Sequence, residues 1–130
     1  MNIKEEMLSK KRWVVYGISS DESKFGYKIP KRMLDHGYEV YGVNPKYKGE
    51  KIAGVDVYAS ISEISQEIDC IDIVVNPKIA VGVLEEAKES NIKNIWLQPG
   101  TWDENVLNKA EDLNLEVVYD DCVYAILGPK

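Results

Sequence analysis

The sequence has few cysteines, a single histidine and no long apolar run. Its two cysteines, Cys70 and Cys122, are far apart and fit neither a CxxC redox motif nor a zinc pattern, so two buried thiols are the default interpretation. The N-terminal stretch `MNIKEEMLSKKR` is charged throughout, and the apolar runs have only a handful of residues. We therefore expect neither a membrane span nor a signal peptide, and a cytoplasmic location.

The sequence also lacks an excess of basic residues. It has 16 Lys and Arg against 22 Asp and Glu, for a formal net charge of −6. A general nucleic-acid binder needs a basic face to displace counterions, so this class is excluded and any anionic ligand must be held locally. The 130 residues, 45% hydrophobic and 29% charged, are typical of one soluble globular domain spanning 1–130.

No constellation of catalytic or metal-binding residues is found. His36 is expected at the end of a helix beside Gly37, away from a ligand site, where it would interact with the helix dipole. The sequence has no HExxH motif, and His36 so placed completes no Ser-His-Asp triad. The acidic pairs at 85–86 and 120–121 are interpreted as solvated faces or strand ends, with a ligand contact left open for the second pair. We therefore predict no metal site and no enzymatic activity.

Near-continuous apolar strands alternate with helical segments, which indicates a parallel sheet covered on both faces. Strands are predicted at 13–18, 38–43, 55–58, 70–75, within 92–100, and at 115–119. Helices are predicted at 1–9, 26–36, 79–90 and 103–113, with a helical turn at 60–65, a loop at 44–54 and a tail after 119. The first helix, within 1–10, is expected to pack on the domain. This order predicts an α/β fold: a single Rossmann-like, doubly wound, mainly parallel sheet.

In such a sheet the ligand lies outside the carboxyl ends of the strands, where strand order reverses. Polar and small residues follow the predicted strands at this edge: Gly17, Ser19, Ser20, Asn44, Pro45, Lys46, Asn76, Pro77, Gln98, Pro99 and Gly100.

The turn after the first strand departs from the dinucleotide fingerprint GxGxxG. Gly17 is followed by Ile18 and Ser19, and the next glycine is Gly26. A serine hydroxyl can donate to a phosphate oxygen, and so can the backbone amides at the start of the following helix. The alternative is that Gly17 and Ser19 form only a strand-ending turn.

Lysines accompany this turn and the end of the second strand. Lys24 and Lys28 flank the predicted helix start at Gly26 and Tyr27. The second strand ends in `VNPKY`, where an NAD enzyme has an acidic residue for the ribose diol. Lys46 would attract a ribose carrying its own phosphate, as in NADP or coenzyme A; the alternative is a solvated loop lysine.

The motifs `VVYGIS`, `HGYEVYGVNPKYKG`, `IDIVVNP` and `IWLQPG` occur in this order. From Lys11 onward the sequence resembles the small bacterial and archaeal CoA-binding proteins, whose fold is similar to the N-terminal domain of the succinyl-CoA synthetase alpha subunit. The synthetases carry a phosphohistidine on a separate domain that 130 residues do not encode. The resemblance therefore implies a non-catalytic protein that binds CoA or a CoA thioester as carrier, store or redox-responsive sensor.

The resemblance implies a CoA site along the predicted edge. The diphosphate would lie on the glycine turn, the adenosine by the `NPKY` loop, and the pantetheine arm past Asn76 and Pro77, with Gln98 and Gly100 at the thiol end. The predicted cofactor-binding residues are Gly17, Ile18, Ser19, Lys24, Gly26, Tyr27, Lys28, Asn44, Pro45, Lys46, Tyr47, Asn76, Pro77, Gln98, Gly100 and Cys122.

The sequence is compatible with several alternatives for the role of Cys122, for the ligand and for the function. Cys122 follows the last strand, so one hypothesis is a mixed disulfide with CoA, against a buried structural thiol. Lys46 also suits an NADP-binding reductase or sensor. A third interpretation is a protein-interaction domain using Trp102, Tyr119 and Tyr124. Free CoA, an acyl-CoA and a CoA disulfide are equally compatible ligands, and a homodimer is the default expectation for assembly.

Overall fold

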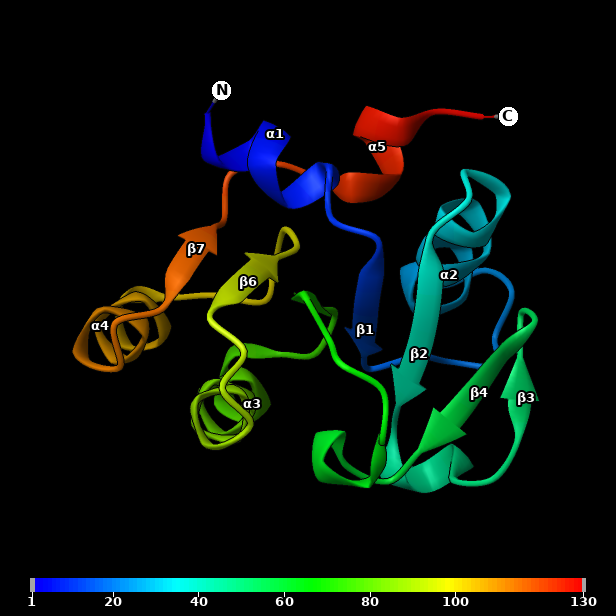
Figure 1. The fold of residues 1–130 in the computed structure, drawn as a ribbon, viewed down its shortest axis with the longest axis horizontal. Coiled ribbons are helices and arrows are strands. Elements are labelled where there is room, and N and C mark those ends of the chain that lie inside the picture. The colour runs from blue at the N-terminus through cyan, green and yellow to red at the C-terminus, as the bar shows by residue number, and fades with distance from the viewer. Residues whose placement is uncertain (1, 130) are drawn as a thin grey trace.

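The computed structural model describes residues 2–129 and contains one seven-stranded sheet (Figure 1). The strand order is β3-β4-β2-β1-β5-β6-β7, and every pairing is parallel except that of β3 with β4. The strands are β1 (Arg12–Tyr16), β2 (Glu39–Val43), β3 (Lys51–Ile52), β4 (Val55–Tyr58), β5 (Cys70–Ile73), β6 (Asn94–Leu97) and β7 (Glu116–Val118). The predicted Rossmann-like, doubly wound sheet is confirmed.

Five α-helices and two short 3-10 helices cover the sheet. They are α1 (Ile3–Leu8), α2 (Phe25–Asp35), η1 (Pro45–Tyr47), η2 (Ile61–Glu63), α3 (Pro77–Glu89), α4 (Glu104–Asp112) and α5 (Val123–Leu127). In Figure 1, α3 and α4 lie on one side of the sheet and α1, α2 and α5 on the other. The predicted N-terminal helix is confirmed from Ile3 to Leu8, and Met1 lies outside the described residues.

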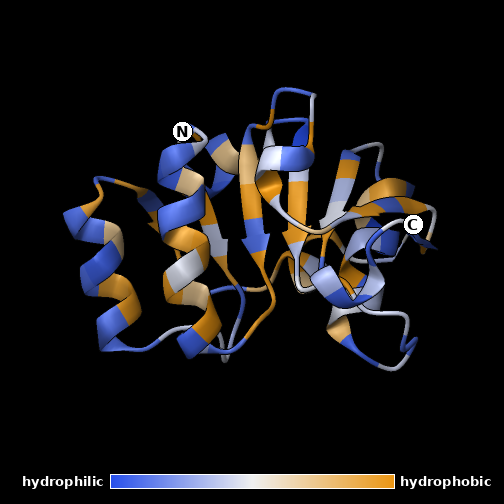
Figure 2. Cartoon of the chain, turned by 90° about the horizontal axis from the view of Figure 1, so that it is seen from below, coloured by the Kyte–Doolittle hydropathy of each residue, from blue (hydrophilic) through white to orange (hydrophobic). Residues whose placement is uncertain are grey.

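The core is divided in two by the sheet because successive strand side chains point to opposite faces. Val14, Ile71 and Ile95 belong to the buried cluster under α3 and α4, whereas Trp13 and Trp96 belong to the cluster under α1, α2 and α5. All four residues of β5 are buried. Figure 2 shows these apolar strands between helices whose outer surfaces are hydrophilic. Burial on both faces explains why the strand sequences are nearly continuous in apolar residues.

Two elements differ from the sequence-based predictions. The stretch 44–54, predicted to be a loop, contains η1 and the edge strand β3, which pairs antiparallel with β4. The two strands are joined by Ala53 and Gly54, with φ values of 53° and 83°. Such a turn usually carries Asn-Gly, so alanine conceals the hairpin signal. The tail after β7 contains α5, whose five residues are too few to show a helical period.

The interpretation of the acidic pairs as solvated faces or strand ends needs correction at Glu86. Glu85 is exposed and pairs with Lys109 at 3.1 Å. Glu86 is half-buried and accepts hydrogen bonds from the Tyr16 hydroxyl at 3.2 Å and from the Ile61 amide at 2.6 Å. A buried backbone amide needs such a partner, so Glu86 ties α3 to β1 and η2.

The second acidic pair also contacts other elements. Asp120 and Asp121 each lie 3.2 Å from the Lys4 ammonium group of α1, and the Asp121 carbonyl accepts the indole N–H of Trp96 at 3.0 Å. These contacts therefore link α1 to the segment before α5, and link that segment to β6 of the sheet.

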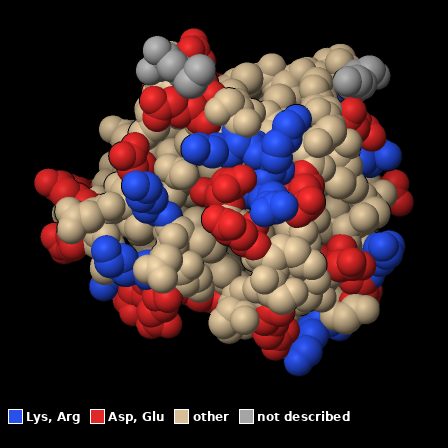
Figure 3. All heavy atoms as spheres, viewed as in Figure 1, with Lys and Arg blue, Asp and Glu red and all other residues tan. Residues whose placement is uncertain are grey.

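Charges of both signs are interspersed on the molecular face seen in Figure 3. This agrees with a formal charge that is only moderately negative. Within residues 2–129, the helices are too short or too polar to cross a bilayer.

Candidate functional site

The carboxyl ends of β1, β2, β5 and β6 meet at one edge of the sheet. After β1 the chain crosses to β2 on one side, whereas β5 leads to β6 on the other, so strand order reverses between β1 and β5. Two hollows lie at this point, as the topology predicts. We call them the polar hollow and the apolar cavity.

The polar hollow has a volume of about 350 Å³. It is lined by Gly17, Ser19, Lys24, Phe25, Gly26, Asn44, Lys46, Tyr47 and Val74. All but Phe25 and Val74 belong to the residues predicted from the sequence, so the structure brings the glycine turn and the `NPKY` loop together.

The backbone of the glycine turn lies directly against the first turn of α2. Gly17 has a φ of +105°, and a Cβ there would lie 2.7 Å from a Val75 methyl group. A Cβ on Gly26 would lie 2.6 Å from the Gly17 carbonyl oxygen. Both positions therefore require glycine, and this close approach is held by the Ser19 amide, which donates to the Gly26 carbonyl at 3.1 Å.

Hydrogen-bond donors and cations dominate the polar hollow. The Ser19 hydroxyl oxygen accepts the Asp21 amide at 3.1 Å, which leaves its own hydrogen free to donate. Lys24, the N-cap of α2, provides no capping side-chain bond, and the Tyr27 amide donates to the Lys24 carbonyl at 3.0 Å, so the amides of Phe25 and Gly26 are the ones left without a partner among the described residues. No carboxylate is among the described residues that line the hollow. This combination suits a phosphate group.

Asn44 positions the `NPKY` loop against the glycine turn. Its amide nitrogen donates to the Ile18 carbonyl at 2.8 Å, and its oxygen accepts the Lys46 amide at 3.1 Å. Hydrogen bonding with Ser20 lowers the pKa of the Tyr47 phenol; burial opposes this shift, and the charge of Lys46 adds to it. The predicted residues of both segments thus form one connected polar surface.

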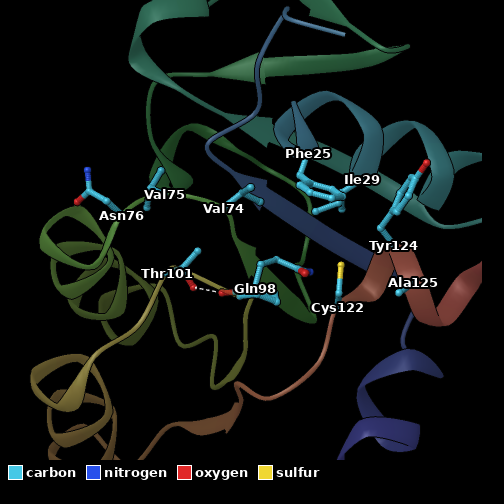
Figure 4. A pocket seen from close by; sticks show the side chains of 12 residues that line it. Phe25, Ile29, Val74, Val75, Asn76, Gln98, Thr101, Cys122, Tyr124 and Ala125 are labelled. Atoms are coloured by element: carbon cyan, nitrogen blue, oxygen red, sulfur yellow. Dashed lines mark hydrogen bonds between the residues drawn. The ribbon is translucent and has the colours of Figure 1, made fainter. Parts of the chain in front are cut away.

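The apolar cavity has a volume of about 580 Å³ (Figure 4). Its lining is Phe25, Ile29, Val74, Val75, Asn76, Gln98, Pro99, Gly100, Thr101, Cys122, Tyr124 and Ala125. Asn76, Gln98, Gly100 and Cys122 were predicted as site residues. The apolar lining residues were missed because nothing in the sequence distinguishes them from core residues.

A buried polar pair lies beneath this cavity. Gln98 is 3% exposed, and its Nε2 donates to Oδ1 of the fully buried Asp72 at 2.7 Å. Asp72 Oδ2 and Gln98 Oε1 have no partner among the described residues. Burial raises the pKa of Asp72 to about 8, although the bond from Gln98 opposes the shift. The sequence signal for this pair is the single carboxyl residue inside the apolar segment `CIDIVV`, and it was not used to predict Asp72 as a buried residue beside the site.

Helix α5 forms one wall of the cavity and is fixed to α2. Arg32 Nη1 donates to the Tyr124 carbonyl at 2.9 Å, and the guanidinium carbon lies 3.5 Å from the centre of the Tyr124 ring. Phe25 packs edge-on against the same ring, with centroids 5.6 Å apart. His36 is the C-cap of α2, as predicted, and its Nε2 lies 2.9 Å from the Gly128 carbonyl oxygen.

Phe25 and Val74 line both the polar hollow and the apolar cavity. The two spaces are therefore neighbours that meet at these two residues, and we call them together the recess: donors and cations line one part and mainly apolar side chains line the other. Phe25 is 52% exposed, so part of its ring is available to a ligand although its edge packs against Tyr124.

Some predicted residues do not line this recess. The Ile18 side chain is fully buried, and Tyr27 and Lys28 line a separate hollow with Arg32 and Asp35. Pro45 and Pro77 open η1 and α3 beside the recess without lining it.

Asn76 lines the apolar cavity and also caps α3 by accepting the Ile79 amide at 3.1 Å. Of the aromatic residues predicted for an interaction surface, Trp102 and Tyr119 pack together with ring centroids 4.9 Å apart. Tyr124 instead contacts Arg32 and Phe25.

The part of the chain that the structure describes contains no cluster of three or more His, Cys, Asp or Glu side chains suited to a metal ion. No Asp, Glu or His lines either end of the recess among these residues.

Comparison with known proteins gives a consistent result. The family described as CoA binding domain matches residues 11–128. The uncharacterised protein YneT of Bacillus subtilis is 30% identical over 93% of this chain and 88% of its own. The alpha subunit of an ADP-forming acetate–CoA ligase I of Pyrococcus furiosus is 38% identical over 68% of this chain, which spans only 20% of that subunit.

A solved structure also covers nearly the whole chain. A hypothetical protein from Pyrococcus horikoshii superimposes with a TM-score of 0.86 at 31% sequence identity, covering 95% of this chain and 85% of that one. The likeness therefore extends over nearly the whole fold.

Proposed function

Because the chain belongs to the CoA binding domain family, we propose that it binds coenzyme A along the recess and that it does so without catalysing a reaction. The observation that carries this proposal is the recess shared through Phe25 and Val74. Coenzyme A has a matching division along its length, with phosphates at the nucleotide end and, at the other, an uncharged pantetheine arm whose methyl and methylene groups alternate with two amides.

The polar hollow would hold the phosphates. The Ser19 hydroxyl and the first amides of α2 would donate to the diphosphate, and Lys46 would interact with the 3′-phosphate. The pantetheine arm would pass Phe25 and Val74, and its thiol end would lie near Gln98 and Cys122. The apolar lining supports this direction, because the arm buries methyl and methylene groups there.

A carrier or store is the role that the recess supports best. A general acid or base must lie within hydrogen-bond reach of the reacting group. The ionisable residues among the described lining of the recess are lysines, tyrosines and one cysteine; the imidazole and carboxylate groups that most often serve as general acids and bases are not among them. The acetate–CoA ligase subunit is about five times longer than the matched region, so its activity is not part of this proposal.

Isothermal titration of CoA, dephospho-CoA, NADP and NAD in the presence of reductant tests the proposal. We expect CoA to bind preferentially. Replacement of Lys46 by alanine should weaken CoA binding about ten- to a hundredfold, since a charge-assisted bond contributes roughly 1.5–3 kcal/mol. Dephospho-CoA should bind the unmodified protein as weakly, and Lys46→Ala should not weaken it further.

Lys48→Ala is the matched control. Lys48 lies two residues further along the same loop and forms an exposed ion pair with Glu63 at 3.5 Å, outside the recess lining. Its loss should leave CoA affinity unchanged. Equal affinities for CoA and dephospho-CoA would refute the role of Lys46. A preference for NADP would identify NADP, and not CoA, as the ligand, and absence of binding to any of the four would refute the proposal.

A further inference from the structure

The two cysteines occupy opposite environments. Cys70 in β5 is fully buried, its sulfur lies 3.9 Å from the Met7 carbonyl oxygen, and burial raises its thiol pKa to about 12. Cys122 is partly exposed and lines the apolar cavity. Only the thiolate reacts with disulfides, so Cys70 is inert and Cys122 is the reactive candidate.

A second feature of this end of the cavity points to a ligand. Gln98 is almost completely buried and lines the cavity, yet its Oε1 has no hydrogen-bond partner among the described residues. Figure 4 shows the Gln98 amide and the Cys122 sulfur directed into the same part of the cavity. This amide oxygen has two lone pairs, so it can accept a hydrogen bond from an amide N–H or the thiol of a pantetheine arm.

We propose that Cys122 exchanges with CoA disulfide to form a mixed disulfide, so that the protein retains CoA covalently under oxidising conditions. This inference rests on the proposed function, because the phosphate end must place the sulfur of the arm beside Cys122. The Cys122 thiolate attacks one sulfur of the disulfide, the S–S bond of CoA disulfide breaks, and a bond from Cys122 Sγ to one CoA sulfur forms. The other CoA leaves as a thiolate and takes up a proton. Cys122 is oxidised and the departing CoA is reduced, so electrons balance.

Proximity, rather than thiol activation, would drive this exchange. No Lys, Arg or His is among the described residues of the apolar cavity, and the neighbouring Asp121 carboxylate accepts the Cys122 amide at 2.9 Å. Cys122 therefore has no cationic partner there. Binding of one half of CoA disulfide in the recess raises the effective concentration of its sulfur at Cys122. A disulfide that the recess does not bind lacks this advantage.

Incubation with CoA disulfide, followed by intact mass measurement, tests the inference. We expect one reductant-sensitive adduct with the mass of one CoA on the unmodified protein and on Cys70→Ala, and none on Cys122→Ser. Peptide mapping of the unmodified protein should place the adduct on Cys122, which gives an answer even where a variant fails to fold. The rate should exceed that with glutathione disulfide by at least about tenfold, and excess glutathione should release the CoA.

The outcomes separate this inference from the proposed function. Reversible binding of CoA under reductant, without an adduct from CoA disulfide, refutes the mixed disulfide and leaves CoA binding intact. Equal rates with CoA disulfide and glutathione disulfide show an ordinary exposed thiol and also refute it. Absence of CoA binding under reductant refutes the proposed function itself.

Discussion

Gln98 donates a 2.7 Å hydrogen bond to Asp72 in a pair that is almost completely inaccessible to solvent, and within residues 2–129 each side chain keeps one oxygen without a partner. When Asp72 is ionised, both Asp72 Oδ2 and Gln98 Oε1 are buried acceptors without a hydrogen bond, which is unfavourable. When Asp72 is protonated, its carboxyl group can donate a hydrogen bond to Gln98 Oε1. This amide oxygen has two lone pairs, so one remains for a ligand in the cavity.

The first prediction concerns stability against pH. The pKa of Asp72 is raised from 3.8 to about 8 in the folded protein, so the folded state binds the proton more tightly than the unfolded state. The stabilisation that comes from this bound proton is fully present below pH about 4 and is lost as the pH rises through about 8. Asp72→Asn, which keeps a donor for Gln98, should remove this loss and raise the free energy of unfolding at pH 8 by roughly 2–5 kcal/mol.

Urea denaturation of both proteins between pH 4 and 9 measures this difference. Asp56→Asn serves as the control, because Asp56 is exposed and pairs only with Lys51 at the surface. Its difference from the unmodified protein should change little with pH. Parallel curves for Asp72→Asn and the unmodified protein would show that Asp72 is ionised in the folded state at neutral pH.

The fold could be predicted largely because the central strands are buried on both faces and therefore have distinctive sequences. The edge strand β3 and helix α5 could not be predicted, since two and five residues are too few for a periodic pattern. The same limit applies to the site. Residues such as Ser19 and Lys46 follow strand ends and are recognisable there, whereas Val74 and Ala125 resemble core residues until the fold exposes them to a cavity.

The second prediction uses neighbouring glutamates as a matched pair. Glu86 accepts two hydrogen bonds in a half-buried position, and its loss leaves the Ile61 amide without a partner. Glu86→Ala should lower the free energy of unfolding by about 1–3 kcal/mol. Glu85→Ala removes only an exposed ion pair with Lys109 and should change it by less than about 0.5 kcal/mol. Equal effects in chemical denaturation would mean that the Glu86 bonds are not maintained in solution.

The third prediction concerns Arg32, which holds α5 against α2. Its planar guanidinium both donates to the Tyr124 carbonyl and stacks on the Tyr124 ring, which lysine cannot reproduce. Arg32→Lys should therefore loosen α5 and weaken CoA binding, because Tyr124 and Ala125 line the apolar cavity.

Hydrogen exchange measures this loosening directly. The amides of Ile126 and Gly128, bonded to the carbonyls of Cys122 and Tyr124, should exchange at least about tenfold faster in Arg32→Lys, while β5 amides keep their protection. Lys31→Ala is the control, since Lys31 is an exposed cation on the same helix. Unchanged exchange in α5 would show that the Arg32 contacts do not hold this helix.

The last prediction compares two helical glycines. A Cβ on Gly26 would lie 2.6 Å from the Gly17 carbonyl oxygen, which is backbone, so the glycine turn must move away from α2. Gly26→Ala should therefore destabilise the protein by about 1–3 kcal/mol and greatly weaken CoA binding, because the phosphate donors separate. Gly82 in α3 has no atom near its Cβ position, and Gly82→Ala should instead stabilise the protein by about 0.5–1 kcal/mol without affecting binding. If folded Gly26→Ala bound CoA normally at low temperature, the glycine turn could not be the phosphate site.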